Sequence, residues 1–99
     1  MYKISFHAEV KKDLKGLPHS HLAAIKTAIG ERLSLHPYDF KALSGKKYHG
    51  LYRLRIADYR VVYYIENEIV RILAIGHRSK IYDNTVYSGL EFEIINHNV

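Results

Sequence analysis

The sequence contains no cysteine, so disulfide bonds and thiolate metal sites are excluded. No apolar run approaches the ~20 residues that a membrane-spanning helix needs, and the first residues lack the apolar core of a signal peptide. We therefore expect a cytoplasmic protein with no membrane partner. The chain has 99 residues, of which 47% are hydrophobic. That is enough for a single domain, residues 1–99, with a core of its own.

Acidic residues are scarce in the central part of the chain. Residues 41–80 contain nine Lys or Arg against three Asp or Glu, a net charge of +6, whereas residues 81–99 carry a net charge of −3. A basic central region is typical of a protein that binds nucleic acid or an acidic protein partner. A generally basic surface without a specific ligand explains the charge equally well.

Hydrophobic periodicity predicts one strand, two helices and three further strands. Ser20 is a candidate N-cap of the second helix, and Pro37 ends it. Gly30 lies inside that helix at a cost of ~1 kcal/mol against alanine, which predicts close packing against a neighbour. The predicted elements are a strand at 2–7, helices at 8–16 and between Ser20 and Pro37, a basic loop at 38–47, and strands at 48–56, 59–66 and 69–76.

The short links between the last three strands allow only antiparallel hairpins. The order β-α-α-β-β-β therefore predicts an α+β domain, with a helical hairpin packed on one face of an antiparallel sheet. Tyr52, Tyr59 and Tyr63 are expected in the core between sheet and helices or at its rim. Residues 90–94 alternate strictly and form either a final strand or one turn of helix.

Arginines alternate with apolar residues in two of the predicted strands. Arg53 and Arg55 are two residues apart, so their side chains point to the same side of a strand. Arg60 follows in the next strand, and Arg78 follows the last one. Because arginine binds phosphate oxygens bidentately and stays charged, this set predicts a phosphate-backbone ligand, either cut or only bound.

RNA cleavage requires few catalytic groups from a protein, because the substrate carries its own nucleophile, the ribose 2′-hydroxyl. Positioning and electrostatic stabilisation supply most of the catalysis in phosphoryl transfer. The chain has no paired carboxylates and no spacing typical of metal ligands. His19 and His21 lie two apart at a helix start and point to different faces, so we do not expect them to bind a metal together with His36. The arginines therefore suit a nuclease that uses neither metal nor cofactor.

Two further residues are candidates for proton transfer. His77 adjoins Arg78 at a strand end and is either a titrating group or a hydrogen-bonded structural histidine. Tyr82 lies beyond the last strand, where it could stack on a base or transfer a proton, or serve no function.

The ordered segments Gly50–Ile56, Asp58–Tyr63, Ile75–Arg78 and Ile81–Tyr82 resemble the RelE branch of the RelE/ParE toxin superfamily. The resemblance runs from about residue 2 to residue 82. It implies the fold of small microbial ribonucleases and a toxin of a type II toxin–antitoxin system. Such toxins enter the ribosomal A site and cut mRNA, leaving a 2′,3′-cyclic phosphate, and a cognate antitoxin neutralises them.

The resemblance also assigns roles to individual residues. Arg60 matches a phosphate-stabilising arginine, Arg78 an arginine that assists the leaving oxygen, and Tyr82 a tyrosine that orients or stacks on the substrate. Arg53 and Arg55 match two basic residues that are lysines in some members. Since guanidinium is a poor proton acceptor, we interpret these two as phosphate clamps. The general base is then unassigned, with His77 as a candidate.

Three functions are compatible with these observations. The first is a ribosome-dependent mRNA endoribonuclease. The second is a ParE-like toxin that poisons DNA gyrase without nuclease activity, and the third is a basic binding module with no activity. The family often ends near residue 82, whereas this chain continues through residues 83–99. That extension is interpreted as an edge strand, a dimer contact or an acidic strip on the basic face.

Overall fold

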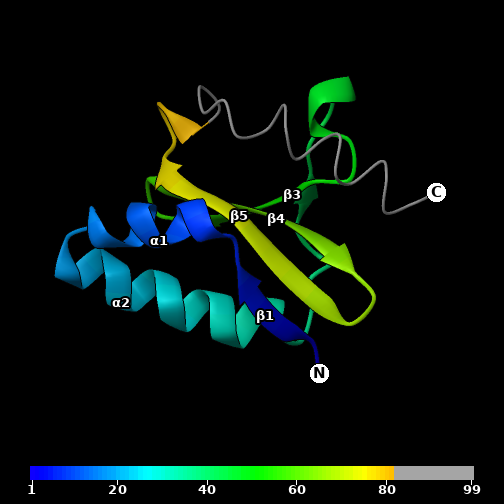
Figure 1. Ribbon diagram of the computed structural model, residues 1–99, viewed down its shortest axis with the longest axis horizontal. Coiled ribbons are helices and arrows are strands. Elements are labelled where there is room, and N and C mark those ends of the chain that lie inside the picture. The colour runs from blue at the N-terminus through cyan, green and yellow to red at the C-terminus, as the bar shows by residue number, and fades with distance from the viewer. Residues whose placement is uncertain (82–99) are drawn as a thin grey trace.

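Two helices pack against one face of a five-stranded mixed sheet (Figure 1). The computed structural model describes residues 1–81, so the possible strand at 90–94 lies outside the described residues. The strand order is β1-β5-β4-β3-β2. The elements are β1 (Lys3–Phe6), α1 (Ala8–Lys15), α2 (His19–Ala28), β2 (Lys41–Ala42), β3 (Tyr52–Ile56), β4 (Tyr59–Glu66) and β5 (Ile69–His77). The predicted α+β class is confirmed.

Strands β3, β4 and β5 form two consecutive antiparallel hairpins, as predicted. Their turns contain Ala57 and Asn67, with φ angles of 52° and 57°. This left-handed region suits tight hairpins because it matches the twist of the strands. Asparagine tolerates it well, whereas alanine is strained there. The short β2, which the sequence placed in a loop, pairs antiparallel with β3 at the edge of the sheet.

The first strand makes the sheet mixed rather than wholly antiparallel. β1 runs parallel to β5, with Lys3 opposite Ile69. β1 ends at Phe6, so the second half of β5 continues beyond it, and α1 covers that edge. There the Asp13 carboxylate accepts a hydrogen bond of 3.2 Å from the Ile75 backbone N–H. Burial raises the pKa of Asp13; the hydrogen bond opposes this rise and the nearby Glu9 charge adds to it.

Each face of the sheet has its own apolar cluster. The larger cluster lies between sheet and helices, and the fully buried Tyr63 belongs to it. Its hydroxyl donates to the Pro37 carbonyl over 2.7 Å, which ties the loop after the helices to the sheet. Tyr52 and Tyr59 pack against this cluster, as predicted. The second cluster lies on the opposite face and consists of Leu51, Val62, Tyr64, Leu73, Ala74 and Ile81, with Leu43 and Tyr48 packed against it.

Two predictions about the second helix are wrong. The helix begins directly after Pro18, whose carbonyl accepts from the Leu22 N–H, and Ser20 lies inside the first turn. Gly30 is exposed, and an added Cβ would meet nothing within 4 Å. It lies in a π-helical turn, Ile29–Leu33, and its carbonyl accepts from the Ser34 hydroxyl. No helix within residues 1–81 is long and apolar enough to cross a membrane.

Candidate functional site

On the sheet face opposite the helices, four of the cations lie on three neighbouring strands, β2, β3 and β4. Arg53 and Arg55 in β3 share this face, and the register places Arg53 opposite Lys41 in β2 and Arg55 opposite Arg60 in β4. We refer to these four residues as the arginine face. Like charges directly opposite each other destabilise an antiparallel pair, by an amount on the order of 0.2–1 kcal/mol. Two adjacent pairs of like charge make this face a candidate site for an anion.

Arg60 is the most deeply placed of these cations. Arg60 is only 6% exposed. Nη1 donates to the carbonyl oxygens of Ala57 and Tyr59, at 3.0 and 2.9 Å. These two bonds hold the strained β3–β4 turn and fix the plane of the guanidinium. Arg60 is thus a pre-oriented positive charge rather than a freely rotating one.

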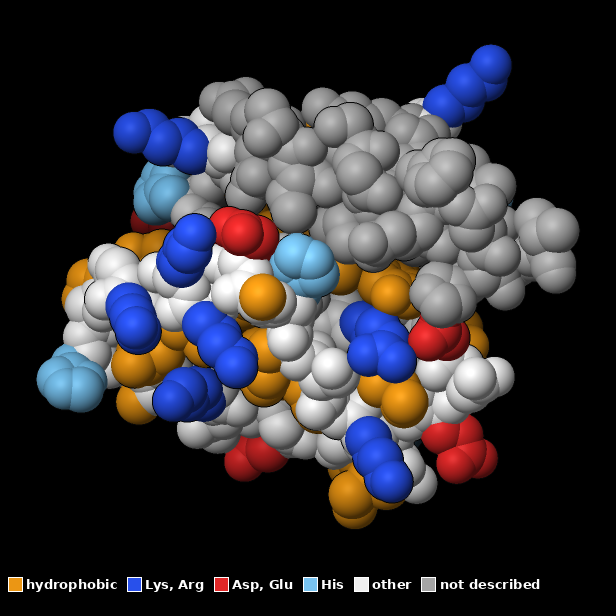
Figure 2. Space-filling view, viewed as in Figure 1, with side chains coloured by type: hydrophobic (Ala, Val, Ile, Leu, Met, Phe, Trp, Pro, Cys, Tyr) orange, Lys and Arg blue, Asp and Glu red, His pale blue; other side chains and the backbone are white. Residues whose placement is uncertain are grey.

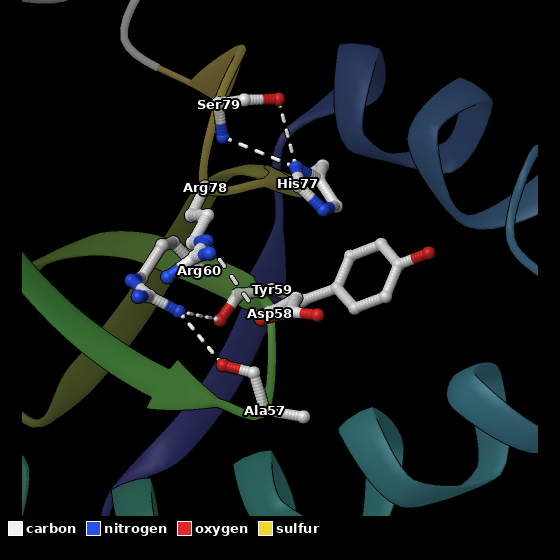
Figure 3. Close-up of polar contacts among 7 residues, drawn as sticks. All are labelled: Ala57, Asp58, Tyr59, Arg60, His77, Arg78 and Ser79. Carbon is white, nitrogen blue, oxygen red and sulfur yellow. Dashed lines mark hydrogen bonds and ion pairs between the residues drawn. The ribbon is translucent and has the colours of Figure 1, made fainter.

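Arg78 is anchored to the same turn from the end of β5. Its backbone N–H donates to the Asp58 carbonyl over 2.8 Å, and its Nε lies 3.7 Å from the Asp58 carboxylate. Both side chains of this ion pair are more than half exposed, so the pair contributes little to stability. Figure 3 shows Arg60 and Arg78 on the same side of the turn. The turn therefore brings together two arginines that are 18 positions apart in the sequence.

Arg53 has a buried donor without a partner. Its Nε is buried and has no hydrogen-bond partner within residues 1–81. Buried donors are rarely left unpaired, and each exception needs an explanation such as a ligand that is absent. For a guanidinium on a cationic sheet face, the fitting ligand is an anion.

Positive charge is not confined to the arginine face. Figure 2 shows Lys and Arg side chains over the region where α1 and α2 lie in Figure 1. The lysines of these helices are exposed, and Lys12 pairs with Glu9 at 3.7 Å. Net charge alone therefore does not locate the site. We define the candidate site by the cations that are paired across strands and by the turn that holds two arginines.

Most of the chain matches known toxins. A family model described as the ParE toxin of the type II toxin–antitoxin system parDE matches residues 4–82. RelE3, a toxin of Methanocaldococcus jannaschii, is 31% identical over 82% of this chain and 96% of its own length. RelE1 of the same archaeon is 36% identical over 84% of this chain and 97% of its own length. The chain belongs to the RelE/ParE toxin family.

Solved structures agree with this membership. A chain of the toxin–antitoxin complex RelBE2 from Mycobacterium tuberculosis aligns with a TM-score of 0.72 and 31% identity, over 78% of this chain and 98% of that chain. The isolated Escherichia coli RelE toxin aligns with a TM-score of 0.66 over 95% of this chain and 99% of that chain. At 21% identity it shows the shared fold alone. The chain is thus a RelE-like toxin of a type II toxin–antitoxin system.

His77 of this RelE-like toxin lies on the helix side of the sheet. It is opposite Tyr59, and their ring centroids are 5.9 Å apart in an edge-on contact. Its Nδ1 accepts the Ser79 N–H over 3.1 Å and lies 2.8 Å from the Ser79 hydroxyl. A neutral ring with Nδ1 as the acceptor carries its proton on Nε2. The fold thus separates His77 from the arginine face, although it is adjacent to Arg78 in sequence.

The remaining candidates are not brought into this site. Tyr82 lies outside the described residues. His21 contacts the Tyr59 ring at a centroid distance of 5.0 Å, and His36 lies 3.7 Å from Asp39. Within residues 1–81, no group of three His, Cys, Asp or Glu is arranged to hold a metal ion.

The sequence did not single out Lys41 as a site residue of the toxin. It was assigned to a basic loop, because a strand of two residues has no detectable alternation. Its pairing with Arg53 depends on a contact between segments 12 positions apart. The one signal that could have found it is the cluster of lysines that precedes β3.

Proposed function

We propose that the toxin is an mRNA endoribonuclease that acts in the ribosomal A site without a metal or cofactor. The observation that carries this proposal is the arrangement around the β3–β4 turn. Arg55 lies opposite Arg60, and Arg78 is bonded to the same turn as Arg60. The RelE names of relatives at 31% and 36% identity support the same activity.

In the proposed reaction the substrate 2′-oxygen attacks the adjacent phosphorus and the bond to the 5′-oxygen breaks. The products are a 2′,3′-cyclic phosphate and a 5′-hydroxyl, and one proton leaves the 2′-oxygen while another reaches the 5′-oxygen. Negative charge grows on the phosphate oxygens. Arg60 meets this charge in a fixed orientation, which avoids reorganisation during the reaction. Arg55 clamps the phosphate, and Arg78 assists the leaving oxygen.

The proton acceptor is not one of these arginines. Guanidinium groups have a pKa above about 12 and accept no proton near neutrality. His77 lies on the other side of the sheet from Arg55 and Arg60, so we do not assign it as the base. Tyr82 keeps the role that the sequence resemblance implies, which is to orient or stack on the substrate.

The partners follow from the same proposal. Chains in the RelBE complexes of Mycobacterium tuberculosis and Methanococcus jannaschii match this chain at 31% identity. We expect that a cognate antitoxin binds and neutralises this toxin as well. A substrate on the ribosome requires that the toxin acts in the cytoplasm.

A second candidate function is poisoning of DNA gyrase. The description of the matching family model, which names ParE, is the observation that favours it. A gyrase poison needs no phosphate site for RNA. This function therefore does not explain why like-charged residues are paired on the arginine face. The two functions differ in what they damage, since the nuclease cuts translated mRNA whereas the gyrase poison causes DNA breaks.

The experiment is controlled expression of the wild-type toxin and of Arg78→Ala in the same host. Arg78 is exposed and forms one weak ion pair, so the variant should fold normally. We expect wild-type expression to arrest growth and deplete translated mRNA, and Arg78→Ala to do neither. Lys26→Ala removes an exposed charge from α2 and should remain toxic. DNA damage with intact transcripts, or full toxicity of Arg78→Ala, would refute the nuclease.

A further inference from the structure

A small pocket lies at the β2–β3 edge of the arginine face. It has a volume of about 240 Å³ and is lined by Lys41, Ala42, Leu43, Ser44, Tyr48 and Arg53. Arg55, Arg60 and Arg78 do not line it. The pocket is therefore distinct from the β3–β4 turn, where the proposed cleavage site lies.

The polar groups of the pocket suit an anion. Lys41 and Arg53 are directly opposite each other across the strand pair, so their charges share one side of the sheet. The Nε of Arg53 is buried and unpaired, and the hydroxyl-bearing Ser44 is a third possible donor. Among residues 1–81, no carboxylate lines the pocket. Two cations held together without an acid between them are unfavourable unless an anion joins them.

The position of the pocket points to a repeating anion. Arg53 and Arg55 are two residues apart on the same face of β3, a spacing of about 6.8 Å. Arg53 lines the pocket, whereas Arg55 is the cross-strand partner of Arg60. A ligand that covers both places needs negative charges in series, which is the pattern of a nucleic-acid backbone. A single acidic side chain of a protein would satisfy only one of them.

We propose that Lys41 and Arg53 form a second phosphate subsite, which holds a non-scissile phosphate of the bound RNA. The proposal rests on the proposed RNA substrate but assigns Arg53 to binding rather than to the cleavage step. Bound there, the phosphate accepts from the Arg53 Nε and pairs with the Lys41 ammonium. The subsite then fixes the register of the RNA, so that a neighbouring phosphate lies between Arg55 and Arg60.

The test uses a short single-stranded RNA in which every 2′-hydroxyl is methylated, so that it binds without being cut. A series of such RNAs carries one uncharged methylphosphonate linkage, moved along the strand. Affinities are measured at low and moderate salt for the wild type, for Lys41→Gln/Arg53→Gln and for the control Lys11→Gln/Lys26→Gln. The control removes two exposed cations from α1 and α2 and so matches the charge change. Thermal unfolding verifies that all three proteins fold.

We expect the wild type to lose affinity most strongly at particular linkages. In Lys41→Gln/Arg53→Gln one of these linkages should cease to matter while the others keep their effect. The salt dependence should fall by about 0.7 log units of affinity per log unit of salt, the value for one phosphate contact on a single strand. The control should keep the complete wild-type pattern.

Three results would overturn the subsite. The first is an unchanged linkage pattern in Lys41→Gln/Arg53→Gln, and the second is no RNA binding by the wild type at low salt. The third is lost affinity for the cognate antitoxin with unchanged RNA binding, which would assign the pocket to an acidic protein segment. Failure of the nuclease proposal would give a different result from failure of the subsite. The linkage pattern would be present, but the unmodified RNA would not be cut on ribosomes.

Discussion

Removal of one charge from the Arg55–Arg60 pair should stabilise the fold while it weakens the function. The two arginines are direct cross-strand partners, and Arg55 is the exposed member. Arg55→Gln keeps the length of the side chain and removes the repulsion, which is worth about 0.5 kcal/mol for such a pair. In a domain of this size, we expect the melting temperature to rise by about 2–4 °C. RNA binding should weaken, because one phosphate clamp is lost.

The assay is thermal unfolding of both proteins at low salt and at 1 M salt. Screening shortens the range of the repulsion to about 3 Å at 1 M, so the gain in stability should shrink there. Lys3→Gln is the matched control, because Lys3 is exposed in β1 and lies opposite the apolar Ile69. It should not raise the melting temperature. A destabilised Arg55→Gln, or a gain that is equal at both salt concentrations, would refute the assignment of an electrostatically strained site.

Three further predictions concern single contacts. Tyr63→Phe removes the buried hydrogen bond to the Pro37 carbonyl and should lower the unfolding free energy by about 1 kcal/mol; an unchanged urea midpoint would contradict this. Burial raises the pKa of Asp13, so the folded protein binds this proton more tightly than the unfolded chain does. The resulting contribution to the free energy of unfolding is complete below the unfolded pKa and is lost as pH rises through the folded pKa. The stability of wild type relative to Asp13→Asn should therefore fall as pH rises above about 4, the ordinary pKa of an aspartate, and a difference that grows with pH would show the opposite sign. Asp58→Asn frees Arg78 from its exposed ion pair and should tighten RNA binding with little change in stability, whereas weaker binding would count against a phosphate role for Arg78.

Local features of the sequence were sufficient for most of the fold. The two-residue link at Ala57 and Asp58 predicted a hairpin, and alternation predicted that Arg53 and Arg55 share a face; the register of β3 and β4 agrees with both. The parallel pairing of β1 with β5 joins residues 66 positions apart, and no local pattern encodes it. The exposed π-helical turn at Gly30 was also missed, because a glycine inside a helix is compatible with both close packing and an irregular turn.

The candidate site was only partly predictable for the same reason. The hairpin link implies that Arg55 and Arg60 are partners, since a two-residue turn sets the register. The same counting from the Asn67–Glu68 turn would have placed Gly76 opposite Tyr59. A bulge between Val62 and Tyr63 shifts the register and brings His77 there instead, on the helix side. The hydrogen bonds of Arg60 to the turn and the partnership of Lys41 with Arg53 depend on side-chain placement and on a long-range contact. Sequence periodicity contains neither.

The most direct test of the proposed activity is the fate of an end-labelled mRNA on programmed ribosomes with purified toxin. The nuclease account predicts cuts inside codons, with a 2′,3′-cyclic phosphate on the upstream fragment and a 5′-hydroxyl on the downstream fragment. Arg60→Gln or Arg78→Gln should lower the cleavage rate by at least about 100-fold, the usual effect of removing one charge-stabilising group. Intact mRNA with the wild-type toxin, or undiminished cleavage by both variants, would contradict the account.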